Sequence, residues 1–483
     1  MASWLIIKMK QTLGGEGMCM ICRRNDRDMR EPAFMIAAPG SGSGKTMITC
    51  GLLALLKKKG FKPRAFKCGP DYIDPMFHKN VLGVPSRNLD TFFTGKEMTR
   101  ALYQQPEENY IHDISVVEGV MGLYDGLGGI REEGSSYDLA DKLRIPVILV
   151  VDAHGMSRSI IPLVSGFLRY DREHLIKGVI FNKMSEKVYK TISGLVESEL
   201  GIVSLGYIPK LKEISFGSRH LGLISPEEID SLDSSLALLM AQMEKTLDLK
   251  EILRISEMVE VLPQYRLDIK DVSGGRPVKI GVARDEAFSF FYEDNLRILK
   301  AAGAEIVYFS PVHDDILPEG INGLIFYGGY PELYLKELSR NLNMINSIRD
   351  AVNGGMPVIA ECGGFMYMHD SIISDSGAEY KMCGLVHGKC SNTGHLVRFG
   401  YVSIEEKESR FLGKNENIRG HEFHYYDSTD NGISCRVSKP VSSTGWDEIK
   451  TGPVSWLGFP HIYYPSNPEY VYHFLEEAER YRG

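Results

Sequence analysis

The sequence predicts two α/β domains, each built on a parallel sheet covered by helices. Short apolar runs alternate with longer amphipathic stretches twice along the chain, over residues 31–206 and again over 278–360. The runs are almost continuously apolar, as in strands that are buried on both faces. At 483 residues the chain is also too long for one ordinary core, which favours two or three domains.

Composition narrows the class of protein. A hydrophobic fraction of 43% and a charged fraction of 24% are typical of a globular protein. A net charge of −8 gives no electrostatic reason to expect nucleic acid or an anionic membrane as a partner. The sequence contains no apolar run near the roughly 20 residues of a spanning helix, and residues 1–30 lack the apolar centre of a secretory signal. Eight scattered cysteines are not a disulfide framework, so we expect a cytoplasmic protein.

Changes in pattern place the domain boundaries. Cys19 and Cys22 form a C-x-x-C without a second pair at zinc spacing, so we interpret the segment around them as a disordered extension. A Ser-Gly-Gly-Arg-Pro joint at 273–277 separates two alternating regions. The predicted parts are an extension at 1–30, a first domain at 31–224, a helical connector at 225–276 and a second domain at 277–483.

The first domain opens on a Gly-rich loop between a strand and a helix. Strands are expected at 33–38, 63–68, 114–117, 147–151, 178–181 and 203–207, with helices such as 45–58 and 137–143 between them. The loop contains Gly42, Gly44, Lys45 and Thr46, although Pro39 stands where a standard phosphate-binding motif has its first glycine. Backbone N–H groups and the helix N-terminus can hold phosphate oxygens, and Lys45 can reach the outer phosphates. The context predicts a polyphosphate site.

Polar side chains follow the other strands of this domain. Because ligands of parallel sheets bind at the carboxyl ends of strands, these side chains should share one edge. Asp71 and Glu118 are candidates to hold Mg²⁺ with the Thr46 hydroxyl, since Mg²⁺ takes oxygen ligands together with phosphates. Asn182, after the fifth strand, is a candidate to read a nucleotide base.

The second domain repeats the alternation and then changes character. Strands are expected at 278–283, 305–309, 323–327 and 357–360, with helices at 292–302 and 332–353. Residues 381–456 are richer in short strand-like runs and turns, which suggests an antiparallel extension.

Cys362 lies at a strand-to-helix turn in the second domain. A tight elbow exposes a nucleophile, and the Gly363 N–H can help to hold an oxyanion, with Gly329 as the other donor. The thiol also needs a base. Spacing leaves this base open among four histidines: His387, His421, His424 and His461. A phosphate-binding loop joined to a cysteine nucleophile suggests glutamine hydrolysis coupled to ATP-dependent amide formation, in which ATP activates a carboxylate and ammonia attacks it.

The motifs taken together resemble the cobyrinate a,c-diamide synthase family over about 31–475. They lie at residues 42–46, 69–75, 87–90, 118–126, 218–223, 283–288, 328–332, 360–364 and 419–424. The resemblance implies a dethiobiotin-synthetase-like P-loop domain followed by a class I glutamine amidotransferase-like domain. It implies amidation of carboxylates a and c of a cobalt corrinoid with ATP, Mg²⁺ and L-glutamine, during cobalamin synthesis.

The resemblance also assigns roles to residues. Cys362 matches the glutaminase nucleophile, and His461 matches the histidine that activates it. The substrate is expected near Tyr72, Asp74, Tyr124 and Asp125, on the face toward the other domain.

Two departures concern the environment of His461. His461 is followed by Ile462-Tyr463 instead of a second histidine, and the Glu two residues later in related glutaminases is absent, so the group that orients His461 stays open.

Other functions fit part of the sequence. The same chemistry could act on hydrogenobyrinate or a nickel sirohydrochlorin, which carry similar carboxylates. A ParA-like ATPase shares the P-loop but has no use for Cys362 and its glycines. The sequence leaves the oligomeric state open, with a homodimer as one option.

Overall fold

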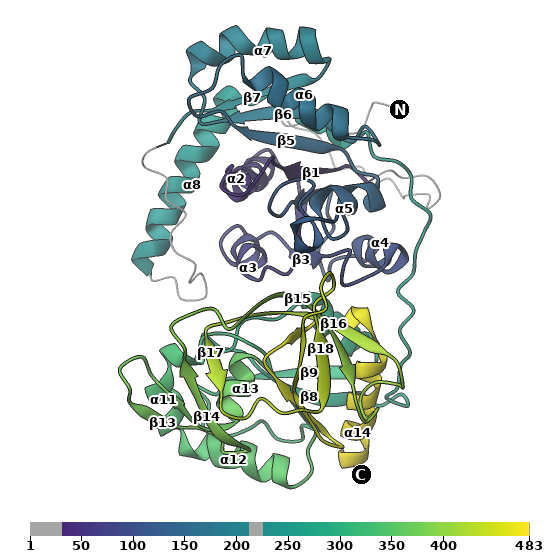
Figure 1. Cartoon of the computed structure of the whole chain (residues 1–483), viewed down its shortest axis with the longest axis vertical. Coiled ribbons are helices and arrows are strands. Elements are labelled where there is room, and N and C mark those ends of the chain that lie inside the picture. The colour runs from purple at the N-terminus through teal and green to yellow at the C-terminus, as the bar shows by residue number, and fades with distance from the viewer. Residues whose placement is uncertain (1–30, 212–225, 483) are drawn as a thin grey trace, which may run out of the picture. The chain divides into compact units, whose positions relative to one another are not determined.

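The computed structural model describes residues 31–211 and 226–482, in two compact units that divide between Arg266 and Leu267 (Figure 1). The predicted extension with its C-x-x-C, and the motif at 218–223, lie outside the described residues. Each unit is built on its own sheet, so the prediction of two α/β domains is confirmed.

The first unit contains a seven-stranded parallel sheet in the order β3-β2-β4-β1-β5-β6-β7. Its strands are β1 (Ala33–Ala37), β2 (Pro63–Cys68), β3 (Ser86–Leu89), β4 (Ile114–Glu118), β5 (Val147–Asp152), β6 (Ile176–Asn182) and β7 (Val203–Ile208). Its helices are α2 (Lys45–Lys58), α3 (Ile73–Asn80), α4 (Lys96–Gln104), α5 (Ser136–Leu143), α6 (Ile160–Tyr170), α7 (Glu186–Leu200), α8 (Pro226–Thr246) and α9 (Leu249–Ser256). β1 lies at the centre, so the loop that follows it opens at the middle of the sheet edge.

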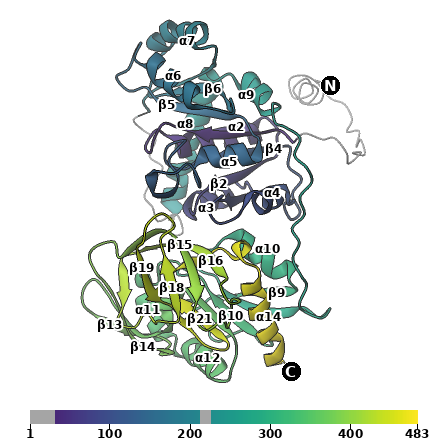
Figure 2. The same ribbon diagram turned by 45° about the vertical axis from the view of Figure 1, so that its right-hand side comes forward.

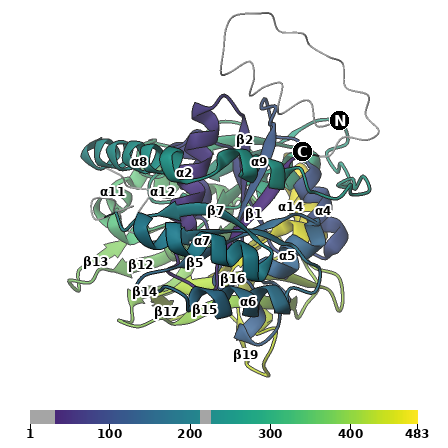
Figure 3. The same cartoon turned by 90° about the horizontal axis from the view of Figure 1, so that it is seen from above.

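Helices α8 and α9 pack on the core of the first unit. Leu239 and Met243 of α8 are buried against α2, and the two helices lie side by side in Figure 3. A Cβ at Gly51 of α2 would lie 2.4 Å from the Met243 sulfur, so Gly51 lets the Met243 side chain pack closely on α2. α9 adds the buried Ile252 and Ile255. The buried side chains of α8 and α9 therefore belong to the hydrophobic core of the first unit.

A polar network stabilises the start of the first sheet. The guanidinium of Arg64, which is 1% exposed, donates to Glu31 Oε1 at 2.7 Å and to Ser115 Oγ at 2.8 Å. His112 Nε2 lies 2.7 Å from the same Glu31 oxygen. Burial raises the pKa of Glu31, but the Arg64 charge and the hydrogen bonds from His112 and Ser115 outweigh it and lower the pKa to about 2.

Glu31→Gln should therefore weaken the first unit in a pH-dependent way. A carboxylate whose pKa is lowered by folding adds stability above its unfolded pKa and loses this contribution as the pH falls toward the folded value. Because Glu31 is 35% exposed, we expect a screened cost of about 1 to 2 kcal/mol at neutral pH. The difference from the unchanged protein should shrink as the pH falls below about 4.5. Scanning calorimetry across this range measures it, with exposed Glu133→Gln as the matched control; a pH-independent difference would contradict the assignment.

The second unit contains a six-stranded mixed sheet in the order β20-β21-β11-β10-β8-β9. Its strands are β8 (Val278–Ala283), β9 (Ala304–Phe309), β10 (Gly323–Phe326), β11 (Val358–Glu361), β20 (Lys450–Thr451) and β21 (Ser455–Gly458). The helices of this unit are α10 (Glu293–Ala301), α11 (Leu335–Arg340), α12 (Leu342–Asn353), α13 (Gly363–Met368) and α14 (Glu469–Arg482). Five of the six strands are parallel, and β20 pairs antiparallel with β21 at the edge.

Two smaller sheets follow and confirm the antiparallel extension. One contains β12 (His369–Ile373), β13 (Glu379–Lys381), β14 (Val386–Asn392) and β17 (Tyr426–Ser428). The other contains β15 (Arg398–Glu406), β16 (Asn417–His424), β18 (Cys435–Ser438), β19 (Gly445–Glu448) and β22 (His461–Ile462). Figure 2 shows β15 with β16 and β18 on its two sides. Only the β12–β14 pair in these two sheets is parallel.

The single helix predicted at 332–353 is wrong. A 3₁₀ turn (Pro331–Leu333) comes first, and α11 and α12 then meet at Asn341. The Asn341 side chain accepts the Met344 N–H and caps α12, so a new helix begins where the sequence pattern had suggested continuity.

Candidate active sites

The phosphate-binding loop connects β1 to α2. Gly42 and Gly44 have φ values of 75° and 95°, a left-handed region that favours glycine. Lys45 begins α2, and its Nζ donates to the Gly40 carbonyl at 3.3 Å and to the carbonyl of Met121. Burial, and then the positive charge of Lys67, lower the pKa of Lys45. The lysine therefore lies among the backbone groups that would surround a phosphate.

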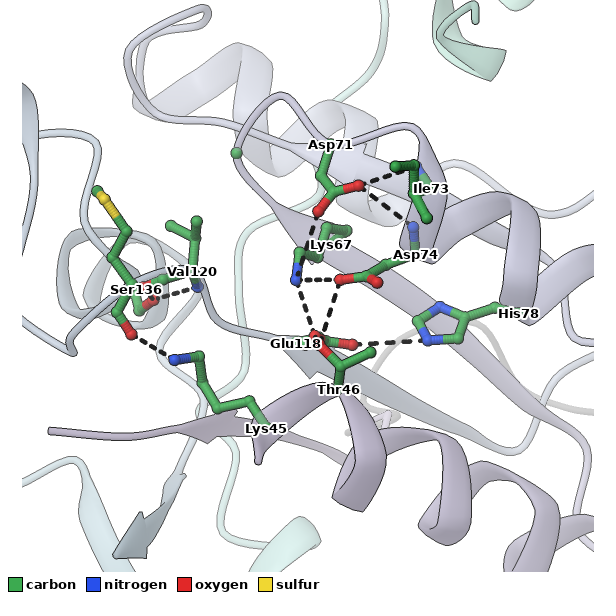
Figure 4. Close-up of polar contacts among 12 residues, drawn as sticks. Lys45, Thr46, Lys67, Asp71, Ile73, Asp74, His78, Glu118, Val120 and Ser136 are labelled. Atoms are coloured by element: carbon green, nitrogen blue, oxygen red, sulfur yellow. Dashed lines mark hydrogen bonds and ion pairs between the residues drawn. The ribbon is translucent and has the colours of Figure 1, made fainter. Parts of the chain in front are cut away.

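A cluster of charged side chains lies beside the loop (Figure 4). The Thr46 hydroxyl donates to Glu118 Oε1 at 2.6 Å and lies 3.5 Å from Asp74 Oδ2. Lys67 Nζ pairs with the same Glu118 oxygen at 2.7 Å and with Asp74 Oδ2. The second oxygen of Glu118 lies 3.6 Å from His78 Nε2. Residues from α2, β2, α3 and β4 thus meet at the carboxyl ends of neighbouring strands.

The charges of the cluster shift one another's pKa values. Burial lowers the pKa of Lys67, but Glu118 and Asp74 outweigh it and raise the pKa well above the usual value. Burial raises the pKa of Glu118, but Lys67 and His78 outweigh it and lower the pKa. Burial and the Glu118 charge raise the pKa of Asp74. The cluster keeps a buried ammonium next to an ionised glutamate.

Two oxygen donors of the cluster fit a Mg²⁺ ion that is bound together with ATP. No group of three or more His, Cys, Asp or Glu side chains is arranged to hold a metal within residues 31–211 and 226–482. Mg²⁺ bound with ATP needs fewer, because phosphates and waters supply most of its ligands. The Thr46 hydroxyl and the Glu118 carboxylate fit that requirement, since both are oxygen donors at the loop.

Asp71 and Asp74 occupy different places. Asp71 Oδ1 accepts the N–H groups of Ile73 at 2.8 Å and Asp74 at 3.2 Å, so it caps the start of α3. Its other oxygen is 4.0 Å from Lys67 Nζ. Asp74 lies nearer to Thr46 and Lys67 than Asp71 does, although the sequence interpretation had placed Asp71 at the metal and Asp74 at the substrate.

The other candidate residues of this unit have structural contacts. Asn182 Nδ2 donates to the Ser43 carbonyl at 2.8 Å, so it braces the phosphate-binding loop. Asp125 accepts the Gly122 N–H at 2.9 Å, and its charge also acts on Lys45. The Tyr124 hydroxyl donates to a backbone carbonyl of α6, and its ring packs on aromatic rings of α5 and α6. Tyr72 is 9% exposed at the start of α3.

Sequence reasoning missed Lys67 and His78. Lys67 is a charged residue inside a strand whose six residues are all buried, and such a charge requires a partner in the fold. A lysine within an otherwise buried strand was therefore the signal by which the sequence could have indicated Lys67. His78 is fully buried and contacts Ser86 Oγ at 3.1 Å through Nδ1, which turns Nε2 toward Glu118.

Cys362 occupies a strained elbow between β11 and α13. Its φ of 48° and ψ of −109° are rare for a residue other than glycine, as at other nucleophile elbows. Its N–H donates to the Gly458 carbonyl at 2.9 Å, and the Gly363 N–H donates to its sulfur. Burial raises the pKa of the thiol far above its usual value, and Glu332 adds to the shift. The thiol is therefore neutral at physiological pH and needs a base.

Two glycine turns bring the predicted oxyanion donors together. A Cβ on Gly363 would lie 3.1 Å from the Gly329 nitrogen, and a Cβ on Gly328 would lie 2.2 Å from His461 Cε1. The Gly328-Gly329 backbone therefore contacts both the Cys362 elbow and the imidazole of His461.

The structure separates the candidate bases. Burial, with a contribution from His424, lowers the pKa of His461 to about 3, so its imidazole is neutral at physiological pH and one ring nitrogen carries no proton. His424 Nδ1 donates to the Tyr426 carbonyl at 2.7 Å, and its ring stacks on Phe459. The His387 side chain is 94% exposed. His461 is the candidate that contacts the glycine turn.

Gly328→Ala should disable glutamine hydrolysis because the new Cβ would overlap the His461 ring. Displacing a catalytic group by about 1 Å can cost roughly a hundredfold, so we expect kcat for glutamine hydrolysis to fall by about tenfold to a hundredfold. Ammonia release measures the effect. Gly194→Ala, where a Cβ meets nothing within 4 Å, is the control; an unchanged kcat would show that His461 is not held by this contact.

Comparison with known proteins decides the family. A model of the CobQ/CobB/MinD/ParA nucleotide binding domain matches residues 34–223, and one of the CobB/CobQ-like glutamine amidotransferase domain matches 279–454. Cobyrinate a,c-diamide synthase of Caldanaerobacter subterraneus subsp. tengcongensis is 38% identical over 453 residues, covering 93% of this chain and 98% of that protein. The chain belongs to the cobyrinate a,c-diamide synthase family. Members from Listeria innocua (38% identity, 92% of this chain and 99% of that protein) and Salmonella typhimurium (36%, 93% and 99%) match at similar length.

Family membership confirms the predicted order of a P-loop domain followed by a glutamine amidotransferase domain. None of the helices that the structure describes is long and apolar enough to cross a membrane.

Proposed function

We propose that this protein amidates the a and c carboxylates of cobyrinate, using ATP and the amide nitrogen of glutamine. One observation carries the proposal: a single chain holds a phosphate-binding loop with a Lys–Glu–Asp cluster and a cysteine elbow with a buried neutral histidine. The second unit would release the ammonia that attacks the carboxylate, and the first unit would activate that carboxylate. Relatives named cobyrinate a,c-diamide synthase, at 36–40% identity, support the choice of substrate.

The first unit activates the carboxylate. A carboxylate resists amines because its oxygen is a poor leaving group, and transfer of the γ-phosphoryl group of ATP to it gives an acyl phosphate. Lys45 lies at the helix mouth and would neutralise charge on the outer phosphates. Bound Mg²⁺ would shield the phosphate oxygens, held by Thr46 and Glu118. Lys67 provides a second, permanently charged ammonium for the incoming carboxylate or the phosphoryl group.

The second unit releases ammonia. His461 takes the proton from Cys362 Sγ while the sulfur attacks the amide carbon of glutamine. The N–H groups of Gly329 and Gly363 hold the oxygen that becomes negative. His461 then gives this proton to the amide nitrogen, the C–N bond breaks, and ammonia leaves the thioester. Water cleaves the thioester to give glutamate and the free thiol. Ammonia then displaces phosphate from the acyl phosphate, forming the amide.

The alternatives make different use of these residues. A ParA-like ATPase would leave the buried Cys362–Gly363 elbow without a role. Hydrogenobyrinate and nickel sirohydrochlorin remain the alternative substrates because they present similar carboxylates. Mg²⁺, the cytoplasmic location and the homodimer are parts of the same proposal; sedimentation of the purified protein tests the dimer.

The test is a panel of tetrapyrrole acids incubated with ATP, Mg²⁺ and glutamine, followed by mass spectrometry of the products. We expect cobyrinate to receive two amides and to be preferred over the other acids. Preferred amidation of hydrogenobyrinate or nickel sirohydrochlorin would change the substrate, and ATP hydrolysis without any amidation would reject the ligase.

A further inference from the structure

The environment of His461 contains a second imidazole. His461 of β22 is paired in register with His421 of β16, and the two rings stack with centroids 5.0 Å apart and an angle of 16° between their planes. His421 is 5% exposed and His461 is 3% exposed. Two neighbouring strands therefore hold two buried imidazoles nearly parallel.

The second imidazole is itself fixed. Tyr292, at the start of α10, lies 2.9 Å from His421 Nδ1 through its hydroxyl, and it is 1% exposed. Its ring also packs edge-on against Tyr463, whose hydroxyl donates to Asp294 at 3.1 Å. An aromatic hydroxyl on a helix thus limits the rotation of a histidine on a strand.

The backbone of Gly328 limits a different movement of His461, which is displacement within the plane of its ring. Gly328 lies against Cε1 of its ring, where even a methyl group would overlap. The ring of His461 is consequently bounded by the backbone of Gly328 and by the stacked ring of His421. The stacked His421 ring limits tilting of the His461 ring on that face, and Gly328 limits its displacement at the Cε1 edge.

We propose that His421 is a positioning residue for glutamine hydrolysis: held by the Tyr292 hydroxyl, its imidazole stacks on His461 and fixes the plane of that ring. This inference rests on the proposed function, because it gives His421 the role of orienting His461, the base that activates Cys362. In the step itself the S–H bond breaks and an N–H bond forms on His461. His421 neither gains nor loses a proton.

Electrostatics agree with this role. Burial lowers the pKa of His421 well below its usual value, and the neighbouring His461 and Lys439 lower it further. Two neutral rings can stack without charge repulsion. Because His421 stays neutral, it also does not repel the positive charge that His461 acquires when it takes the thiol proton.

The experiment compares Tyr292→Phe, His421→Phe and the double variant in the full-length protein, with exposed His387→Phe as the control. Each single change removes the Tyr292–His421 hydrogen bond and keeps an aromatic ring. We expect kcat for glutamine hydrolysis to fall about tenfold in each, with KM for glutamine unchanged. Because both changes break the same bond, the double variant should be no slower than the slower single variant.

Additive losses in the double variant, a rise in KM parallel to the fall in kcat, or an unchanged kcat would each overturn the positioning role. His421→Ala removes the stacked ring as well, so its kcat for glutamine hydrolysis should be lower than that of His421→Phe. Tyr292→Phe removes a single oxygen atom, so it still tests the proposal if His421→Ala does not fold. Failure of the proposed function gives a different result, since the unchanged protein would then release no ammonia from glutamine.

Discussion

Cys362→Ser should abolish glutamine-driven amidation and spare amidation driven by free ammonia. The expected loss with glutamine is at least about a thousandfold, because the sulfur is the nucleophile and a hydroxyl at the same place is far less reactive. The substitution is nearly isosteric at a buried elbow, where Cys362 is 8% exposed, so the fold should persist. Amide formation with each nitrogen source, measured by product mass spectrometry, gives both rates.

The matched control is Cys383→Ser, another buried cysteine of the second unit, which the mechanism does not use. It should retain both activities. Undiminished glutamine hydrolysis in Cys362→Ser would contradict the proposed amidotransferase reaction, in which Cys362 is the nucleophile. Loss of ammonia-driven amidation in the same variant would show that the nucleophile also serves the synthetase reaction.

Lys45→Ala should abolish amidation with either nitrogen source. Its ammonium lies at the mouth of α2 beside the loop carbonyls, and its charge is the one expected to meet the outer phosphates of ATP. Removing one preorganised cationic donor from a site of developing charge typically costs about 10² to 10³ in rate. Phosphate release and amide formation should fall together, whether glutamine or ammonia is supplied.

Lys58→Ala is the control for Lys45→Ala, since Lys58 lies on the same helix with its side chain 52% exposed and paired with Glu244. It should keep both activities. Ammonia-driven amidation that survives in Lys45→Ala would contradict the assignment of carboxylate activation to this loop.

Much of the fold could be predicted because its signals are local. The central strands are continuous apolar runs, and the limits expected for β2, β8 and α2 are those observed. β3 could not be found in the same way, since its four residues are Ser-Arg-Asn-Leu. Arg87 is buried there because Glu107 pairs with it at 2.9 Å, the Leu102 and Gln105 carbonyls accept from its guanidinium, and the ring of Phe66 lies 5.0 Å from it. These partners of Arg87 come from other parts of the chain, so no local sequence pattern predicts β3.

The candidate sites, like the fold, could be predicted only where their signals are local in the sequence. The phosphate-binding loop and the Cys362 elbow follow from glycines at fixed spacing, which sequence displays directly. Lys67 and His78 act through neighbours supplied by β4 and β3, so their roles appear only when the sheet is assembled. Asp71 and Asp74 are three residues apart, and only the start of α3 decides that the first caps the helix and the second meets Lys67.

In the proposed function, one chain couples glutamine hydrolysis to ATP-dependent amidation of cobyrinate. The most direct measurement supplies the purified protein with cobyrinate, ATP, Mg²⁺ and glutamine labelled with ¹⁵N in its side-chain amide, and follows the product by mass spectrometry. We expect a diamide that carries the label in both new amides, with one ATP consumed for each. An unlabelled product, or glutamine and ATP consumed without any new amide, would contradict it.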